Sequence, residues 1–239
     1  MTSLSSIRLS ENHLAGTIPA AFFNLSSLTA FAVAANKLHG KLPSDLGAHL
    51  PNLKDLLLGT NRFTGYLPAS LVNATKIYRL DMSFNGLTGR LPPEIGMLCP
   101  KHLSVSENQI VASTPQDWEF MTLLTNCTRL RIFNLQLNML GGVLPSSVAN
   151  LSAQLELLYV GANEISGKIP FGIGNLVGLN RLQLGFNRFT GSLPDTIGRL
   201  NSLQTLELQN NLVTGFMPSS LGNLTQLLNL YTHNNMFEG

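Results

Sequence analysis

The residues best able to do chemistry are spread along the chain of 239 residues and are not grouped at catalytic spacings. The five histidines are far apart, at His13, His39, His49, His102 and His233. Two cysteines without neighbouring histidines cannot form a structural zinc site. Residues 161–168 differ from a phosphate-binding loop, because the glycine spacing is too long and Ile169 replaces the required Ser or Thr. We therefore expect no enzyme activity, cofactor or metal site in this segment.

Five Asn-x-Ser/Thr triplets indicate a different chemistry, because they are acceptors of N-linked glycans in secreted proteins. They begin at Asn24, Asn73, Asn126, Asn150 and Asn223. Any single triplet can instead be a turn in which the hydroxyl makes a local hydrogen bond. Five copies at one place in a repeat favour glycosylation on one side of the molecule, away from the strands.

The elements that position these residues follow a repeat of about 24 residues. Ten asparagines hold the same place in it: Asn12, Asn36, Asn61, Asn85, Asn108, Asn138, Asn163, Asn187, Asn211 and Asn235. The surrounding pattern, L-x-x-L-x-L-x-x-N-x-L, is that of a leucine-rich repeat, and a fixed period of this length indicates a solenoid.

Residues 179–200 illustrate one coil. Leu182 and Leu184 alternate with Gln183 and a glycine, as in a short strand with one buried face. Asn187 follows where the chain turns, and because a carboxamide both donates and accepts, stacked asparagines should form a ladder. A Gly-x-Leu-Pro motif precedes a convex helical turn, which Gly198 is suited to end.

We therefore predict an α/β solenoid, with a parallel β-sheet on its concave side and short helices or 3-10 turns on its convex side. Residues 1–239 are expected to form a single domain of about ten coils.

The motif L-x-G-x-[IL]-P-x-x-[IL]-G-x-L recurs along the chain, as at Gly89 and Pro92. It resembles the plant-specific subclass of leucine-rich repeats, found in receptor-like kinases, receptor-like proteins and polygalacturonase-inhibiting proteins. Residues 117–130 also resemble immune receptor kinases of the subgroup that includes the flagellin and elongation-factor receptors. The resemblance implies a plant-type superhelix, in which the L-x-G-x-I-P motif adds a second short sheet.

The same resemblance implies the ligand-binding ectodomain of a plant receptor-like kinase, at the extracellular face of the plasma membrane, in immune or developmental signalling. Its partners would be a peptide or protein ligand and a co-receptor kinase of the somatic-embryogenesis type. Any kinase activity would belong to a separate domain. The alternatives are an enzyme inhibitor like the polygalacturonase-inhibiting proteins, a receptor-like protein without a kinase, and a purely structural scaffold.

Composition narrows the list of partners. Charged residues make up 12% of the chain and the net charge is +2, which argues against nucleic acid. No stretch of about 20 apolar residues is present, and the first residues do not form a signal peptide. We expect membrane attachment only through a segment outside this sequence. Both terminal caps of the family are missing, so a fragment of a longer protein is expected.

The fifth coil, residues 108–137, departs from the template. It has six additional residues, and Ala112 replaces the usual glycine, so we expect the second sheet to be interrupted there. Residues 116–126 predict a longer convex helix with Trp118 on its apolar face. Trp118 is either a core residue or a co-receptor contact.

The two cysteines belong to this irregular region. Cys127 replaces a buried leucine of the repeat, a place that suits a small apolar side chain. Cys99 lies on the neighbouring coil at a nearby angular position, so a disulfide is geometrically possible. The irregular repeat lengths around both residues favour two unpaired thiols over a bridge.

The residues between the strand leucines should face the concave surface, where a partner would bind. We predict that the ligand-binding residues are Arg79, Asp81, Phe84, Ile132, Asn134, Leu137, Leu157, Tyr159, Arg181, Gln183 and Phe186. Five of them, Ile132, Leu137, Leu157, Tyr159 and Phe186, would form an exposed apolar strip with arginines beside it, as interface hot spots often do. Our first hypothesis is an extended peptide lying across the strands. The alternative is scattered surface apolar residues without a function.

Overall fold

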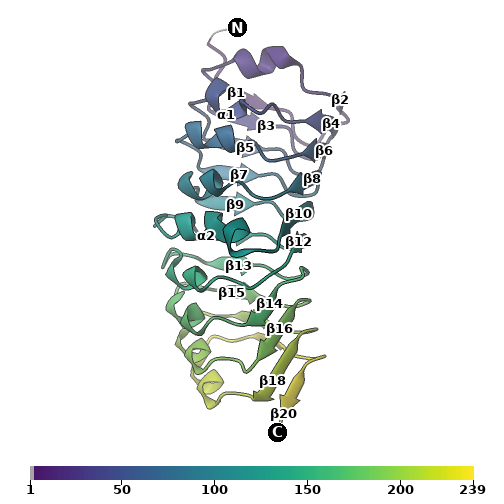
Figure 1. Ribbon diagram of the computed structural model, residues 1–239. Coiled ribbons are helices and arrows are strands. Elements are labelled where there is room, and N and C mark those ends of the chain that lie inside the picture. Colours follow the sequence, from purple (N-terminus) through teal and green to yellow (C-terminus); the bar gives the residue numbers. More distant parts are fainter. Residues whose placement is uncertain (1–2) are drawn as a thin grey trace.

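The computed structural model describes residues 3–239 and shows an elongated stack of coils with the chain ends at opposite ends of the stack (Figure 1). One parallel sheet of ten strands, in chain order, runs along the stack. Its strands are β1 (Ser6–Arg8), β3 (Ala30–Ala32), β5 (Asp55–Leu57), β7 (Arg79–Asp81), β9 (His102–Ser104), β11 (Ile132–Asn134), β13 (Leu157–Tyr159), β15 (Arg181–Gln183), β17 (Thr205–Glu207) and β19 (Asn229–Tyr231). The predicted solenoid with a parallel concave sheet is confirmed.

Each strand of this sheet pairs with the next without a shift, so that equivalent residues of successive coils lie side by side. Leu158 of β13, for example, pairs with Leu182 of β15. Side chains alternate across a strand, and these middle residues are fully buried, with an exposed fraction of 0%. The first and third residues of every strand therefore lie on the opposite, concave face.

The ladder asparagine closes the turn after each strand. The carboxamide nitrogen of Asn187 donates to the carbonyl oxygens of Val160, in the preceding coil, and Leu184, at 3.0 and 3.1 Å. Its oxygen accepts the N–H of Ile165 at 2.9 Å. The residue just before it, Phe186, has a φ of 57°. One buried side chain thus satisfies backbone groups of two coils.

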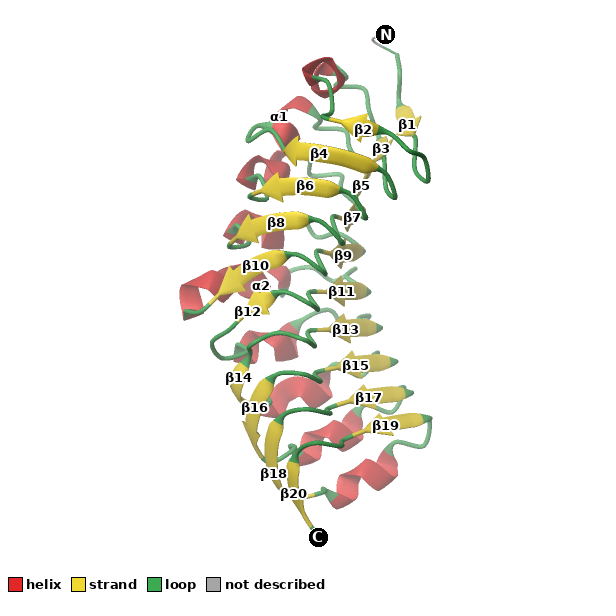
Figure 2. Ribbon diagram, turned by 90° about the vertical axis from the view of Figure 1, so that its right-hand side faces the viewer, coloured by secondary structure: helices red, strands yellow, loops and turns green. Residues whose placement is uncertain are grey.

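A second set of short strands follows the ladder on another side of the coil (Figure 2). Six of them form one sheet: β2 (Ala15–Gly16), β4 (Lys37–Lys41), β6 (Arg62–Gly65), β8 (Gly86–Gly89), β10 (Gln109–Ala112) and β12 (Met139–Leu140). Four more form another: β14 (Ser166–Lys168), β16 (Arg188–Gly191), β18 (Leu212–Phe216) and β20 (Met236–Glu238).

The expected interruption of this second sheet at coil five is wrong by one coil. Strand β10 pairs with both β8 and β12, and the break lies between β12 and β14. Ala112 lies within β10, where no left-handed conformation is needed, so the missing glycine does not end the strand. The φ of 73° at Gly142 is similar to those of Gly65 and Gly89 in the continuous sheet, so it does not explain the break, which an isolated bridge between Val143 and Ser166 spans. Gly141 is held back toward coil five, because its N–H donates to the Ala112 carbonyl at 2.6 Å.

The convex side carries the short helical turns that the repeat predicts. They are η1 (Ala20–Asn24), α1 (Leu46–His49), η2 (Ala69–Asn73), η3 (Pro93–Met97), η4 (Pro115–Trp118), α2 (Glu119–Leu124), η5 (Ser146–Asn150), η6 (Phe171–Asn175), η7 (Asp195–Arg199) and η8 (Ser219–Asn223). Most of these turns follow a proline in extended conformation, such as Pro194 with φ −70° and ψ 140°.

Glycine recurs at the same place within these convex turns, and its cause differs from the one we expected. Gly198 lies inside η7 and is not a left-handed residue that ends it. A Cβ atom on Gly198 would lie 2.4 Å from the carbonyl oxygen of Ser220, and one on Gly174 would lie 2.0 Å from that of Thr196. Glycine is needed because the backbones of neighbouring coils approach closely here.

The long fifth coil forms the predicted convex helix, as η4 continues into α2. Trp118 is 1% exposed, stacks on Phe120 with ring centroids 5.8 Å apart, and donates its indole N–H to the Gly141 carbonyl at 3.0 Å. The core interpretation of Trp118 is therefore confirmed, and burial excludes a direct co-receptor contact. The buried Asp117 carboxylate accepts the N–H groups of Ser113 and Thr114, both at 2.9 Å.

The ladder carries a stability prediction. Replacing Asn187 by alanine leaves the N–H of Ile165 without its partner and removes one of two carboxamide donors from the carbonyls of Val160 and Leu184. The free energy of unfolding should therefore fall by about 1–3 kcal/mol. Chemical denaturation followed by circular dichroism measures the change.

Asn12→Ala is the matched control, since Asn12 is exposed and donates to two carbonyls of its own coil, those of Leu9 and Ser10. Equal losses in the two variants would contradict a ladder that joins coils.

Candidate binding surface on the concave sheet

The register of the ten-stranded sheet places the predicted ligand-binding residues in two parallel columns. Eight of the eleven are first or third residues of β7, β11, β13 and β15. Ile132 lies beside Leu157, and Leu157 beside Arg181; Asn134 lies beside Tyr159, and Tyr159 beside Gln183. The structure therefore brings the residues of coils six to eight together on one face.

Strand β9 separates Arg79 and Asp81 from the other predicted residues. Its outward residues, His102 and Ser104, pair with Arg79 and Asp81 on one side and with Ile132 and Asn134 on the other. Neither was predicted as a site residue, although both occupy the same columns of the repeat. Including them makes the surface continuous from coil four to coil eight.

Phe84, Leu137 and Phe186 lie in the turn just before the ladder asparagines. Their φ values are 54°, 55° and 57°, and their exposed fractions are 48%, 47% and 52%. The fold imposes this left-handed conformation, which disfavours large side chains. Because these side chains are about half exposed, packing does not require a large apolar residue here either. They are therefore candidates for contact with a partner.

Several polar residues of the surface are already paired within the sheet. Arg79 donates to both carboxylate oxygens of Asp55, at 2.8 and 2.9 Å. These hydrogen bonds lower the pKa of Asp55 below its ordinary value, although burial opposes the shift. Asp81 accepts the hydroxyl of Ser83, and Gln183 donates to Glu207 at 3.2 Å. Paired groups of this kind are held in place before a ligand arrives.

A hollow of about 310 Å³ opens on the concave face between coils three and six. It is lined by Leu57, Arg79, Leu80, Asp81, His102, Ser104 and Ile132. Charged, hydroxyl and apolar groups meet in it, which suits a peptide side chain better than a uniformly apolar or uniformly charged ligand.

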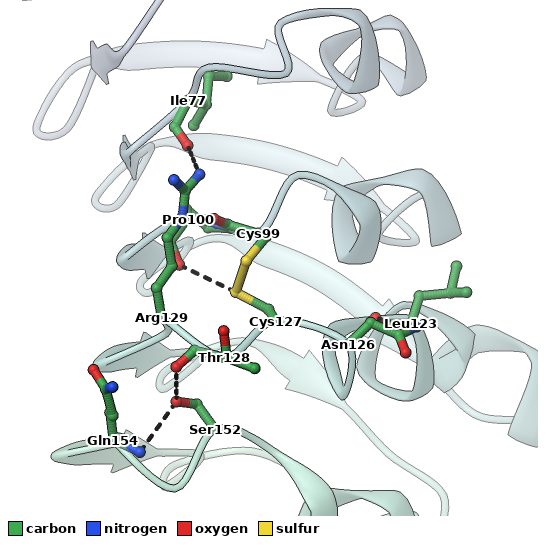
Figure 3. Close-up of a disulfide and its surroundings, with 10 residues drawn as sticks. All are labelled: Ile77, Cys99, Pro100, Leu123, Asn126, Cys127, Thr128, Arg129, Ser152 and Gln154. Atoms are coloured by element: carbon green, nitrogen blue, oxygen red, sulfur yellow. Dashed lines mark hydrogen bonds between the residues drawn. A yellow bond between two sulfur atoms is a disulfide. The ribbon is translucent and has the colours of Figure 1, made fainter.

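Cys99 and Cys127 form a disulfide, which the sequence allowed but did not favour (Figure 3). The backbone of Cys99 is left-handed, with a φ of 46°, and its carbonyl accepts a hydrogen bond from Nε of Arg129. Nη2 of Arg129 reaches farther, to the carbonyl of Ile77 at 3.1 Å. The bridge therefore lies beside an arginine that connects three successive coils.

The five glycan acceptors lie on the convex side. Asn24, Asn73, Asn150 and Asn223 end η1, η2, η5 and η8, and Asn126 follows α2. All five are exposed. Glycans at these positions would leave the concave face free, and glycosylation itself stays a prediction.

The part of the chain that the structure describes contains no cluster of His, Cys, Asp and Glu that could hold a metal ion. Within residues 3–239, no helix has both the length and the apolar character needed to cross a membrane.

The fold and this surface together define a leucine-rich-repeat solenoid with a free concave face. The family described as Leucine Rich Repeat matches residues 3–25, 76–98, 178–200 and 202–224. The chain is 51% identical over 67 residues to the receptor kinase-like protein Xa21 of Oryza sativa subsp. japonica, which covers 28% of this chain and 6% of that protein. It is 44% identical over 80 residues to the LRR receptor-like serine/threonine-protein kinase EFR of Arabidopsis thaliana, which covers 34% and 8%. The chain is therefore homologous to plant leucine-rich-repeat receptor kinases over a small part of their length.

Solved structures extend the similarity to the whole chain. The Arabidopsis receptor kinase HAESA, in complex with the peptide hormone IDA and the co-receptor SERK1, matches with a TM-score of 0.77 and 27% identity over 99% of this chain and 43% of its own. A plant ice-binding protein matches with a TM-score of 0.81 and 26% identity over 98% of this chain and 73% of its own. Proteins with the same solenoid thus bind different ligands, so the fold does not identify the ligand and the surface residues must be used instead.

The environment of His102 generates a pH prediction. Burial, together with the positive charges of Lys101 and Arg79, lowers the pKa of His102 below its ordinary value. The unfolded chain therefore takes up a proton near pH 6.5 that the folded chain resists, so the free energy of unfolding should fall as the pH drops below this point. Melting temperatures measured between pH 5 and 8 should show a weaker decline for His102→Gln.

His39→Gln serves as the control because His39 is an exposed residue of β4. An unchanged pH dependence in His102→Gln would show that His102 is not the group responsible.

Proposed function

We propose that this chain is part of the extracellular ligand-recognition region of a plant receptor-like kinase that acts in immune or developmental signalling. An extended peptide is the proposed ligand, and it lies across strands β11, β13 and β15. The kinase reaction belongs to another domain of the parent protein. A co-receptor kinase of the somatic-embryogenesis type is the proposed second partner, by analogy with the HAESA complex, which contains a peptide hormone and SERK1.

The apolar strip on the concave face is the observation that carries the proposal. Ile132, Leu157 and Tyr159 are partly buried among their neighbours, whereas Leu137 and Phe186 are about half exposed. Neighbouring strands lie about 4.8 Å apart, so crossing three of them takes about 10 Å, or roughly three residues of extended peptide. The strip can thus contact several consecutive ligand side chains and bury their apolar area.

Residues away from the strip support an extracellular location. Disulfides persist mainly in oxidising compartments, and the Cys99–Cys127 bridge is formed. The five exposed glycan acceptors all lie on the convex side, where sugars would not cover the proposed ligand.

Phe186→Asn separates binding from folding. Asparagine tolerates the left-handed conformation better than phenylalanine does, so stability should stay constant or rise by up to about 1 kcal/mol. Loss of the exposed ring should weaken peptide binding by about 1–3 kcal/mol, and Tyr159→Ala should have a similar effect on binding. Peptides selected on the unmodified protein from a phage-displayed library of linear peptides serve as ligands, and calorimetry measures their affinity.

Phe171→Asn is the matched control, because Phe171 lies in η6 on the convex side and is 68% exposed. Selected peptides that bind the Phe186 and Tyr159 variants as tightly as the unmodified protein would refute the proposed surface. Inhibition of a fungal polygalacturonase without any peptide binding would favour the inhibitor alternative.

A further inference from the structure

A cluster of positive side chains lies on the flank of the solenoid where coils three to six enter the concave sheet. They surround a hollow of about 540 Å³, the flank pocket, which is lined by Lys54, Lys76, Tyr78, Arg79, His102 and Arg129, together with Asp55. No motif of the sequence pointed to this pocket, because its residues come from separate coils and from three different columns of the repeat.

The flank pocket concentrates charge that the chain as a whole lacks. Four cationic side chains, Lys54, Lys76, Arg79 and Arg129, face one carboxylate, that of Asp55, which gives a net charge of +3. The complete chain has a net charge of +2. The ammonium group of Lys101 adds a further positive charge beside the pocket, 5.6 Å from the centre of the Tyr78 ring.

Neutral groups, not carboxylates, hold most of these cations in place. Arg129 donates to the carbonyls of Cys99 and Ile77, and its guanidinium lies 5.9 Å from the centre of the Tyr78 ring. Figure 3 shows its side chain extending from beside the disulfide to Ile77. Lys76 donates to the side-chain oxygen of Asn52 at 2.7 Å.

Among the ion pairs of the described residues, none includes Lys54, Lys76, Lys101 or Arg129. Cations that are oriented but not neutralised can bind an anion without first breaking an ion pair. The arrangement is therefore ready to accept a negative group.

We propose that the flank pocket binds a single anionic group, a carboxylate, sulfate or phosphate, carried by the peptide ligand of the concave face. This inference rests on the function proposed above. Arg79 and His102 line both the flank pocket and the concave hollow that reaches Ile132. A peptide lying across β11 can therefore place a negative side chain or terminus in the pocket while its apolar residues contact the strip.

The distribution of charge favours one anionic group over a polyanion. Beyond coil six, the outward-facing residues include Glu156, Glu164 and Glu207, and the first two pair with Arg131 and Arg188. A long acidic polysaccharide or nucleic acid would meet these carboxylates along the same face. The cluster of four cationic side chains lies on the flank of coils three to six, which fits one group of a shorter ligand.

His102 makes the pocket sensitive to pH. Lys101, Arg79 and Arg131 oppose its protonation and Glu156 favours it, while burial adds to the opposition, so that the pKa of His102 is lowered. A bound anion would offset the positive neighbours and favour protonated His102. Anion affinity should therefore increase as the pH falls below 6.5.

Inorganic sulfate is the first probe, because it stays doubly negative over this pH range. At constant ionic strength set with sodium chloride, sulfate should cause saturable NMR shifts at Arg129, Lys101 and His102. The double substitution Lys76→Gln and Arg129→Gln should weaken sulfate binding by about tenfold or more. A pair of matched controls, Arg62→Gln and Arg199→Gln, removes exposed cations of β6 and η7 and should leave sulfate binding unchanged.

Thermal unfolding of every variant verifies that the fold is retained. If the double variant is destabilised, Lys54→Gln and Lys101→Gln, whose side chains make no bond to another coil's carbonyl group in the described structure, provide the same test. NMR shifts that do not saturate, or that are equally large at Arg62 and Arg199, would overturn the proposal that the flank pocket binds an anion.

A second arm of the experiment uses a peptide selected on the unmodified protein. Neutralising its acidic group by amidation should lower its affinity for the unmodified protein by about tenfold and should have little effect on binding to the double variant. Equal losses with both proteins would overturn the link between the pocket and the peptide. If Phe186→Asn weakens binding while the double variant binds normally, the peptide surface stands and the pocket inference fails.

Discussion

The carboxamide of the ladder asparagine is the interaction on which the rest of this structure depends. At every coil the chain leaves the concave strand through a left-handed residue, such as Phe186. From the second coil onward, the asparagine that follows joins its own coil to the preceding one, as Asn187 does. The ladder and the buried middle residues hold the coils together, so the stack does not depend on most of the outward residues of the concave strands. A repeated hydrogen bond thus creates a surface on which side chains can vary with little effect on folding.

Coil five shows what happens when the repeat is lengthened. Its additional residues form η4 and α2, and the buried Trp118 and Asp117 hold the altered backbone with hydrogen bonds to neighbouring segments. The disulfide lies just beyond the end of α2, and Arg129 reaches from there to Ile77, 52 residues earlier in the chain. The irregular coil therefore brings together the groups that a regular stack would keep apart.

The architecture of this chain is shared with proteins that bind different ligands. A receptor kinase in complex with a peptide hormone and a plant ice-binding protein both share its solenoid, with TM-scores of 0.77 and 0.81. The apolar strip around Tyr159 and the positive flank around Arg129 differ in character and lie close together on the concave side and its edge. The proposed ligand, which carries both apolar and anionic groups, would contact both regions.

The sequence by itself determined the solenoid, the ladder, the convex turns and the outward residues of each strand, because each depends on positions within one period of about 24 residues. The tertiary structure alone decided whether Cys99 and Cys127 meet, where the second sheet breaks, and that Gly198 is needed for the close approach of coil nine to its neighbour. It alone also gathered Lys76, Arg79 and Arg129 into one pocket. These features depend on the rotation and spacing between coils, and small irregularities in repeat length change both in ways that a linear pattern does not record.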